Sequence, residues 1–305
     1  MVDLFLVSIL GAMLCGIADT TQLHIAKAME RQGIEIFDQI RARIKKENLE
    51  MEGKVKKPII YLIGFVLNQI EPVWLVIANI FGSYPGLVTS MFGIGLVFLM
   101  LYSVKVLHEP RTRCEVPGAI LIIAGTLVLG IEAFFRPVYD NASVSIIMTY
   151  IFTAICAAIG IIGMVIALKT RNTRTIGLAF GFVAGAFGGQ DILYKLLGQS
   201  TSGQTMVLPN NVLGWTVFLS SFGIAFVAFS VTQWGFARKA PASILVPAYD
   251  SMYVLIPILY QVLLLQGFAI WPSTMAGIAL VIAGIVLMNK LAIKREKIAI
   301  EGSTA

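Results

Sequence analysis

Polar side chains interrupt several of the most apolar stretches of this chain. In FVLNQIEPVWLVI, residues 65–77, Asn68, Gln69 and Glu71 stand together and Pro72 follows directly. Proline has no N–H, so the carbonyl of Asn68 loses its helical donor and is expected to be free for a ligand. A free carbonyl, a carboxylate and two amides form an oxygen-rich cluster that suits a cation or a polar solute. The alternative is a kinked helix whose polar groups satisfy one another.

Other apolar stretches also contain polar side chains that could bind a ligand. Asp191 and Lys195 stand four residues apart, so an i,i+4 ion pair is an equal alternative to a binding role. His24 lies near the expected end of an apolar segment, and we expect it to be solvated. If the ligand is a metal ion, the candidate metal ligands are Glu71, Asp191 and Asp250. The candidate substrate-binding residues are Asn68, Glu71, Asp191, Tyr249, Asp250, Asp19, Gln22, Gln190 and Gln233.

The composition indicates the solvent in which these side chains lie. Of the 305 residues, 57% are hydrophobic and 13% are charged, and the mean hydropathy is +0.84. Soluble domains contain about 25% charged residues, and a soluble fold of this composition could not cover its own surface. We therefore expect an all-α polytopic membrane protein in contact with the lipid bilayer. A carboxylate at the bilayer centre costs about 2.5–3.5 kcal/mol, so it normally faces a cavity or a partner.

Apolar segments of about 20 residues are long enough to cross the hydrocarbon core as helices. We expect nine transmembrane helices, most of them bounded by glycine or proline. Their expected limits are 4–26, 58–81, 85–107, 116–135, 143–168, 175–197, 211–236, 242–264 and 270–290. The expected organisation is a first helix in 1–28, a basic cytoplasmic loop in 29–57, three helices in 58–135, a connecting helix in 136–173, four helices in 174–291 and a cytoplasmic tail in 292–305.

Basic residues gather in alternate loops of this expected topology. The first loop is the most basic, and four further clusters lie on the same side of the membrane, at 105–113, 169–174, 238–239 and 290–297. The positive-inside rule then places the N-terminus outside and the C-terminus in the cytoplasm of a multi-pass cell-membrane protein. This bias accounts for most of the net charge of +6, so no nucleic-acid partner is expected. In the first loop, Ile36, Phe37, Ile40 and Ile44 share one helical face, which indicates either an interfacial helix or, equally, a solvated linker.

Two segments of the chain resemble each other. GAILIIAGTLVLG at 118–130 and GIALVIAGIVLMN at 277–289 share glycines, leucine, isoleucine and alanine at matching positions. In the expected topology the first segment runs outward and the second inward. Helices 1–4 and 6–9 would then form two inverted repeats, with helix 5 as a connector. Inverted repeats of this kind are typical of secondary transporters, whose substrate site lies at the repeat interface near the midplane.

No motif of a soluble enzyme occurs in the sequence. HExxH, GxSxG and Walker-loop patterns are all missing, so we expect neither an enzyme nor an ATP-driven pump. Asp191 and Asp250 depart from the motifs of intramembrane aspartyl proteases, because Gln190 replaces a required glycine and the order is reversed. The three cysteines follow no pairing pattern, so no disulfide, cysteine-bound metal or cofactor is expected. The first residues lack the features of a signal peptide, and we expect them to remain as a helix.

The chain resembles the drug/metabolite transporter superfamily (DMT, EamA-like). The resemblance lies in LHE at 107–109 followed by PG at 117–118, and in ASILVP at 242–247 followed by GIALVIAG at 277–284. Within the superfamily it looks closest to the nine-helix NIPA-type magnesium transporters, because LVTS at 87–90 is similar to their LVTP. The resemblance implies two inverted four-helix repeats, a connecting helix and transport of a small solute.

These features lead to three functional hypotheses. The first is a secondary transporter or facilitator that moves a divalent cation such as Mg²⁺, held by one or two carboxylates together with waters and carbonyls. The second is a permease or exporter for an organic metabolite or amphipathic cation, with proton coupling as an option and Trp74, Tyr249 and Trp234 as stacking surfaces. The third is a non-transporting membrane scaffold, in which the acidic groups simply pair with basic ones. A homodimer is an open alternative in each case.

Overall fold

The computed structural model of this chain is helical throughout the part that it describes. The described residues are 2–34, 56–71, 73–74, 77, 91–109, 115–136, 144–170, 172–200, 208–265 and 267–303. Pro72, LVTS at 87–90 and the face Ile36–Ile44 therefore lie outside them, as do the predictions made for those residues. The helices are α1 (Val2–Gly33), α3 (Lys56–Ile70), α6 (Phe92–Lys105), α7 (Glu115–Phe135), α8 (Ile146–Thr170), α9 (Thr173–Ser200), α10 (Val212–Ala237), α11 (Ala242–Leu264) and α12 (Pro272–Ser303).

Each apolar segment expected from the sequence contains one of these helices, and four of them differ clearly from the expected limits. Helix α6 begins at Phe92, seven residues after the expected start. Helix α1 continues to Gly33, two turns beyond the expected end. Helix α3 ends at Ile70 and Glu71 forms a turn, since a helix usually ends at or before the residue that precedes a proline. Helix α12 continues to Ser303 because the alanine, lysine and glutamate residues that follow its apolar part favour helix strongly.

Four of the described helices, α8, α9, α10 and α11, are long and apolar enough to cross a membrane. The segments Pro58–Ile70, Gly93–Lys105, Val116–Glu132 and Pro272–Leu287 are shorter apolar helices. Since the outer faces of α8 and α10 expose many large apolar side chains, the protein is a helical membrane protein.

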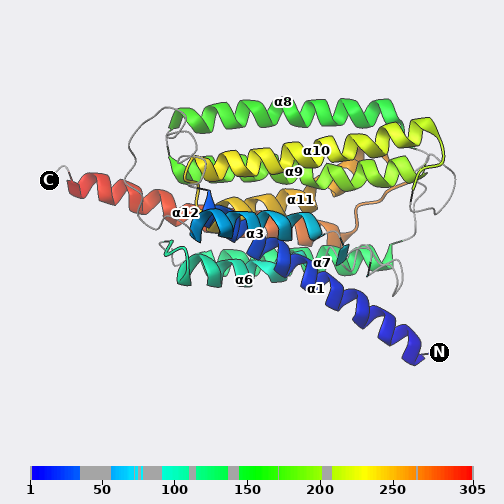
Figure 1. Cartoon of the computed structure of the whole chain (residues 1–305), viewed down its shortest axis with the longest axis horizontal. Helices are drawn as coiled ribbons and strands as arrows, with labels where there is room; N and C mark the ends of the chain where they lie inside the picture. The colour runs from blue at the N-terminus through cyan, green and yellow to red at the C-terminus, as the bar shows by residue number, and fades with distance from the viewer. Residues whose placement is uncertain are drawn as a thin grey trace.

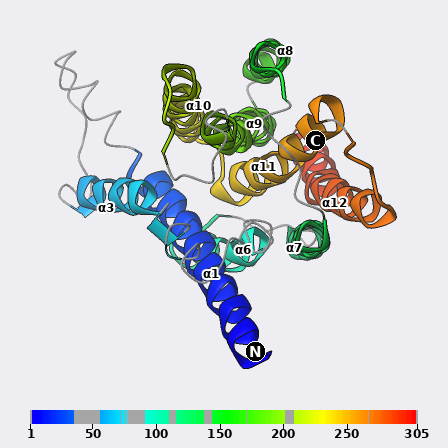
Figure 2. The same ribbon diagram turned by 90° about the vertical axis from the view of Figure 1, so that its right-hand side faces the viewer.

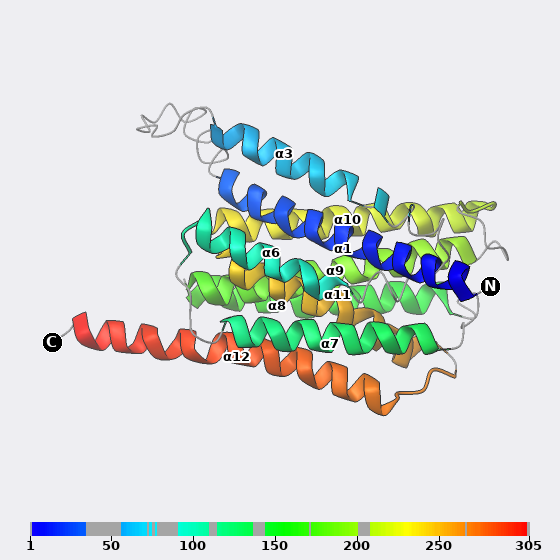
Figure 3. The ribbon, with the colours of Figure 1, turned by 90° about the horizontal axis from the view of Figure 1, so that it is seen from below.

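The helices lie side by side in a bundle, with the two termini at opposite ends (Figures 1 and 3). Helix α1 packs against α3 and α6, while α9 packs against α10 and α11. The end-on view places α1, α3, α6 and α7 on one side and α8, α9 and α10 on the other, with α11 between them (Figure 2). The largest buried side chains, including Phe180, Phe236 and Leu245, fill the space around α11.

Glycines allow two pairs of helices to approach closely. On α9, Gly181, Gly185 and Gly189 recur every four residues, a spacing that predicts close contact with another helix. They face carbonyls of α11 that lie one turn apart, those of Leu245, Tyr249 and Tyr253. Helices α7 and α12 meet through the matched segments at 118–130 and 277–289. A Cβ on Gly125 would lie 2.7 Å from the carbonyl oxygen of Gly277, and a Cβ on Gly284 would lie 2.5 Å from that of Gly118. The matched glycines therefore contact each other reciprocally.

Three hydrogen bonds join the beginning of α11 to the end of α1 and to the residues after α6. Glu109 accepts from the backbone N–H groups of Ala242 (2.9 Å) and Ser243 (3.1 Å), which satisfies two free donors in the first turn of α11. Ser103 donates to the same carboxylate at 2.7 Å. The Nε of Arg31 donates to the carbonyl of Ala240 at 2.9 Å. These hydrogen bonds hold the beginning of α11 against the end of α1 and the residues after α6, and we call them the α11 latch.

Candidate functional site

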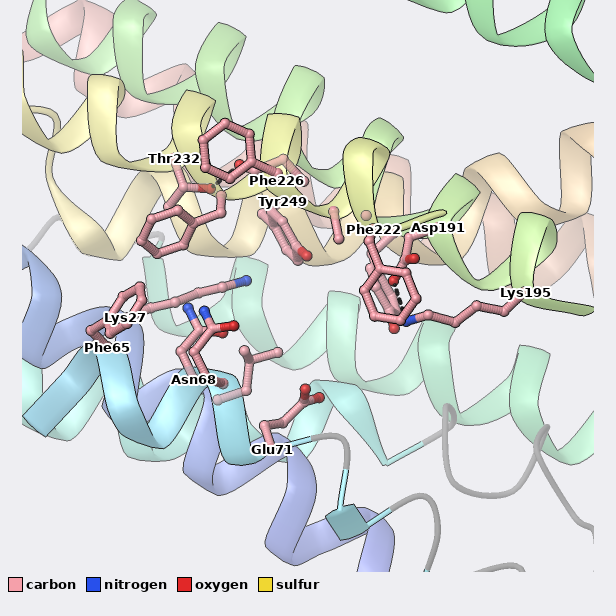
Figure 4. A pocket seen from close by; sticks show the side chains of 17 residues that line it. Lys27, Phe65, Asn68, Glu71, Asp191, Lys195, Phe222, Phe226, Thr232 and Tyr249 are labelled. Atoms are coloured by element: carbon pink, nitrogen blue, oxygen red, sulfur yellow. Dashed lines mark hydrogen bonds and ion pairs between the residues drawn. The ribbon is translucent and has the colours of Figure 1, made fainter. Parts of the chain in front are cut away.

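A cavity of about 440 Å³ lies between α1 and α3 on one side and α9, α10 and α11 on the other. Its volume falls in the range of pockets that hold small organic ligands. Figure 4 shows polar side chains at both ends and aromatic rings between them. The lining residues are Leu23, Lys27, Phe65, Asn68, Gln69, Glu71, Gly188, Asp191, Lys195, Phe222, Ala225, Phe226, Ala228, Phe229, Thr232, Tyr249 and Tyr253.

The wall of the cavity on the α3 and α10 side is aromatic. Phe65 of α3 and Phe229 of α10 meet edge to face, with ring centroids 5.6 Å apart. Phe222 and Phe226 continue this wall along α10. The opposite wall carries Tyr249, which stacks on Tyr253 at a centroid distance of 5.8 Å. These rings offer a large apolar surface, which is a poor environment for a bare metal ion and a good one for a carbon skeleton.

Lys27 is the most unusual polar group of the cavity. Its side chain is only 3% exposed, and its Nζ has no hydrogen-bond partner among the residues that the structure describes. The ammonium lies 3.0 Å from the centroid of the Tyr249 ring, which stabilises it by a cation–π interaction. In Figure 4 the side chain reaches past Asn68 toward Tyr249, into the cavity. The side chain of Lys27 therefore lines the cavity while its ammonium lacks a hydrogen-bond acceptor among the described residues.

Glu71 and Asp19 form a pair of acidic groups beside the cavity. Asp19 is fully buried, and within the described part of the chain neither of its oxygens accepts from an N–H or hydroxyl donor. Its neighbour is the carboxyl group of Glu71, which lines the cavity. Neighbouring carboxyl groups disfavour each other's ionised form, so a proton or a cationic group would stabilise this pair.

Asp191 and Lys195 form an ion pair on α9, with Nζ 2.8 Å from Oδ2. This confirms the i,i+4 alternative, and both side chains also line the cavity. Lys195 lies 5.5 Å from the centroid of the Phe222 ring. Figure 4 places this pair at the far end of the cavity from Lys27. The two charges of this pair therefore neutralise each other.

Two amides expected to bind substrate are instead held by a carboxylate. Glu30 of α1 is fully buried and accepts from Asn68 Nδ2 at 2.9 Å and from Gln233 Nε2 at 2.5 Å. Tyr61 donates to Gln233 Oε1 at 3.2 Å. Asn68 still lines the cavity, whereas Gln233 belongs to this network and does not. Glu30 thus ties α3 and α10 to α1 at one end of the cavity.

His24 and Asp250 form a buried ion pair between α1 and α11. His24 Nε2 lies 2.5 Å from Asp250 Oδ2, and both side chains are fully buried. His24 Nδ1 lies 2.6 Å from the carbonyl oxygen of Thr20, so it must donate there. The prediction that His24 is solvated is wrong, because α1 continues beyond it. Gly95 of α6 leaves the space for its ring, since a Cβ there would collide with Nδ1.

The remaining predicted residues have other roles. Gln22 donates to the carbonyl of Leu67 at 2.8 Å and accepts from Trp74 Nε1 at 2.9 Å, so both side chains join α1 to the α3 region. Gln190 donates to the carbonyl of Ala186 at 3.1 Å. Trp234 packs against Phe180 and does not line the cavity. The structure therefore places Asn68, Glu71, Asp191 and Tyr249 in the cavity and Asp19 beside it.

The candidate metal ligands do not converge. Asp250 pairs with His24, Asp191 pairs with Lys195, and Glu71 pairs with Asp19. Among the residues that the structure describes, no group of three His, Cys, Asp or Glu side chains could hold a metal ion. The geometry therefore does not support the predicted set Glu71, Asp191 and Asp250 as a metal site.

Sequence reasoning missed the two ionisable groups that matter most here, Lys27 and Glu30. Both lie in residues expected to form or border a loop, because the apolar segment seemed to end at Ala26. The sequence does contain a signal that the helix continues beyond Ala26. Polar residues recur there at the spacing of one helical face, at Thr20, His24, Lys27 and Arg31. The partners of these residues come from α3, α10 and α11, which no local pattern could reveal.

The chain was also compared with known proteins. No family model, curated protein or solved structure matches this sequence, so the proposals below rest on its own residues and geometry.

Proposed function

We propose that this protein is a secondary transporter that carries a small organic solute through the cavity between its two groups of helices. The observation that carries the proposal concerns Lys27. This residue is buried, has no hydrogen-bond partner among the described residues and lines an aromatic cavity of about 440 Å³. Lys27 lies near the acidic groups Asp250, Glu30 and Glu71 but forms no hydrogen bond with them. An ionisable group at membrane depth that lacks a hydrogen bond is normally retained for function.

We also propose the membrane arrangement expected from the sequence. In it the protein has nine transmembrane helices, an outside N-terminus, and two inverted four-helix units joined by α8. The packing supports this proposal: α1 contacts α3 and α6 as α9 contacts α10 and α11, and α7 meets α12 through the matched glycines. Such an arrangement agrees with the proposed membership of the drug/metabolite transporter superfamily, and it places the cavity at the interface of the two units.

The solute is proposed to be organic rather than Mg²⁺. Mg²⁺ keeps several waters and requires oxygen ligands at fixed positions, whereas Lys27 places an ammonium in the same space. In vesicles that contain a Mg²⁺-sensitive dye, the reconstituted protein is expected to admit Mg²⁺ no faster than protein-free vesicles do. Uptake above that background that disappears in Glu71→Gln would contradict this expectation and favour the magnesium hypothesis.

Alternating access can be tested without knowing the solute. A cysteine replaces Ala225, a small residue of the cavity wall, in a variant whose three native cysteines are changed to alanine. In sealed membranes of either orientation, this cysteine is expected to react with a membrane-impermeant maleimide, because the cavity opens to each side in turn. The control cysteine at Ile159, on the exposed face of α8, is expected to react from neither side. Labelling of position 225 from one side only would contradict alternating access.

A further inference from the structure

Helices α3 and α10 face each other along the aromatic wall of the cavity, and we call the line between them the α3–α10 seam. Helix α3 packs against α1 and α10 packs against α9, so the two sides of the seam belong to different groups of helices (Figure 2). Tyr61 of α3 donates to Gln233 of α10 at 3.2 Å. One turn further along both helices, the rings of Phe65 and Phe229 meet at a centroid distance of 5.6 Å. These contacts close one end of the seam.

Beyond Phe65 the two helices no longer match in length. Helix α3 ends at Ile70, whereas α10 continues past Phe226 and Phe222 to Val212. Phe226 is 69% exposed and Phe222 is 54% exposed, although both also line the cavity. Gln69, in the last turn of α3, is likewise exposed and lines the cavity. Side chains that belong to the cavity and to the outer surface at once border an opening between the two.

Successive positions of α10 lead from this opening into the cavity. Phe226, Ala225 and Ala228 follow one another around the helix, and all three line the cavity. Phe226 lies on the outer surface, Ala225 is half-buried and Ala228 is 4% exposed. On the other side of the cavity, the buried side chain of Leu23 on α1 lines it as well. The cavity therefore extends from the surface beside Phe226 to α1.

The opening lies at the depth of the lipid hydrocarbon chains. Phe222 and Phe229 enclose the middle of α10, which runs from Val212 to Ala237. At a rise of about 1.5 Å per residue, the segment between them spans about 10 Å, well inside a hydrocarbon core about 30 Å thick. Lipid head groups lie outside this core, so the opening faces acyl chains.

The side chains around the opening favour hydrocarbon over water. The rings of Phe65, Phe222, Phe226 and Phe229 border it, as Figure 4 shows for the first three of the cavity wall that it labels, Phe65, Phe222 and Phe226. Water gains no strong hydrogen bond from these rings, whereas methylene groups gain dispersion contacts with them. An empty space would forfeit those contacts on one side of each ring. An acyl chain from the surrounding bilayer restores them without the loss of a polar interaction.

We propose that the cavity opens sideways into the bilayer at the α3–α10 seam, and that an acyl chain of a neighbouring phospholipid enters this opening. The proposal rests on the membrane arrangement and the cavity of the proposed function, and it adds a route of access through the lipid to the two aqueous routes. The hydrocarbon part of a bound molecule then exchanges between bilayer and cavity without crossing water.

A phospholipid that carries a photoreactive diazirine in the middle of one acyl chain tests the proposal. The wild-type protein is reconstituted in vesicles that contain this lipid and irradiated, and mass spectrometry of its peptides locates the adducts. Adducts are expected at Leu23 and Ala228, which are buried and line the cavity, and at Ile159 on the exposed face of α8. Phe180 and Leu245 are fully buried away from the cavity and are expected to carry none.

A variant that narrows the opening makes the test specific. Ala225→Phe is expected to lower the adduct yield at Leu23 and Ala228 at least about threefold, because the larger side chain occupies space that the acyl chain needs. The yield at Ile159 is expected to stay the same. The matched control Ala158→Phe adds the same ring to the exposed face of α8 and is expected to leave the yields at Leu23 and Ala228 unchanged. Elution volume in size-exclusion chromatography checks that both variants are folded.

Adducts at Phe226 and Ile159 but at neither Leu23 nor Ala228 would overturn the proposal, because the lipid would then cover only the outer surface. Equal yields at Phe180 and Leu23 would also overturn it, since lipid would then penetrate the whole bundle. An unchanged yield at Leu23 in Ala225→Phe would contradict the route past position 225.

The cysteine at position 225 separates these outcomes from a failure of the transport function. If it is labelled from both sides of the membrane while Leu23 carries no adduct, only the sideways opening is wrong. If it is labelled from one side only while Leu23 carries an adduct, the sideways opening stands and alternating access fails.

Discussion

Replacing His24 with leucine is expected to lower the free energy of unfolding by about 3–5 kcal/mol. The substitution leaves the fully buried Asp250 without its partner, and Asp250 Oδ1 already lacks a hydrogen bond. A lone carboxylate at this depth finds no water to replace the imidazole. The measurement is unfolding of the detergent-solubilised protein by SDS, followed by far-ultraviolet circular dichroism.

A double substitution separates the interaction between His24 and Asp250 from the effect of each side chain on packing. His24→Leu with Asp250→Leu removes both polar groups together, so the double variant is expected to be more stable than His24→Leu alone. The variant Asp250→Leu is measured alone as well. If the losses of stability in His24→Leu and Asp250→Leu simply add in the double variant, the pair does not interact as the geometry indicates. The result would then trace the loss to packing against Gly95 rather than to charge.

Replacing Gly185 with alanine is expected to lower the free energy of unfolding by about 1–3 kcal/mol. A Cβ at this position would lie 2.8 Å from the Cα of Tyr249 and would collide with its carbonyl oxygen, so α9 and α11 would have to separate. Tyr249 lines the cavity and faces Lys27, so the same change is also expected to weaken solute binding. Unfolding in SDS measures the loss of stability, and equilibrium dialysis with a radiolabelled solute measures the loss of binding.

Gly163 provides the matched control. It lies in the middle of α8, and no atom lies within 4 Å of the Cβ that an alanine would add. Gly163→Ala is therefore expected to be neutral or stabilising, by up to about 1 kcal/mol, because alanine favours helix. A similar loss of stability in both variants would show that helix contact at Gly185 is not the cause.

Much of the helical framework could be predicted because its signals are local. Runs of apolar residues bounded by glycine and proline gave segments that each contain a helix, and the spacing of Gly181, Gly185 and Gly189 predicted close packing on α9. The ion pair of Asp191 and Lys195 was an explicit alternative for the same reason, since both residues lie on one face of one helix.

The contents of the site could be predicted only in part. Asn68, Glu71, Asp191 and Tyr249 were expected in a cavity because polar groups in apolar helices need one. The end of α1 was misplaced because charged residues after Ala26 suggested a loop. In the structure, side chains from other helices surround those charges: amides of α3 and α10 hold Glu30, and the ring of Tyr249 covers Lys27. Such partners are distant in sequence.

The α11 latch has a consequence for the proposed transport cycle. Glu109 holds the first peptide groups of a helix that lines the cavity, from a position on the other side of the bundle. Hydrogen bonds to a charged group contribute about 1.5–3 kcal/mol each, so parting α11 from Glu109 is a substantial step. In the proposed transport cycle, the empty protein therefore opens this end less often than the other, and the cysteine at position 225 is expected to react more slowly from this side of the membrane than from the opposite side.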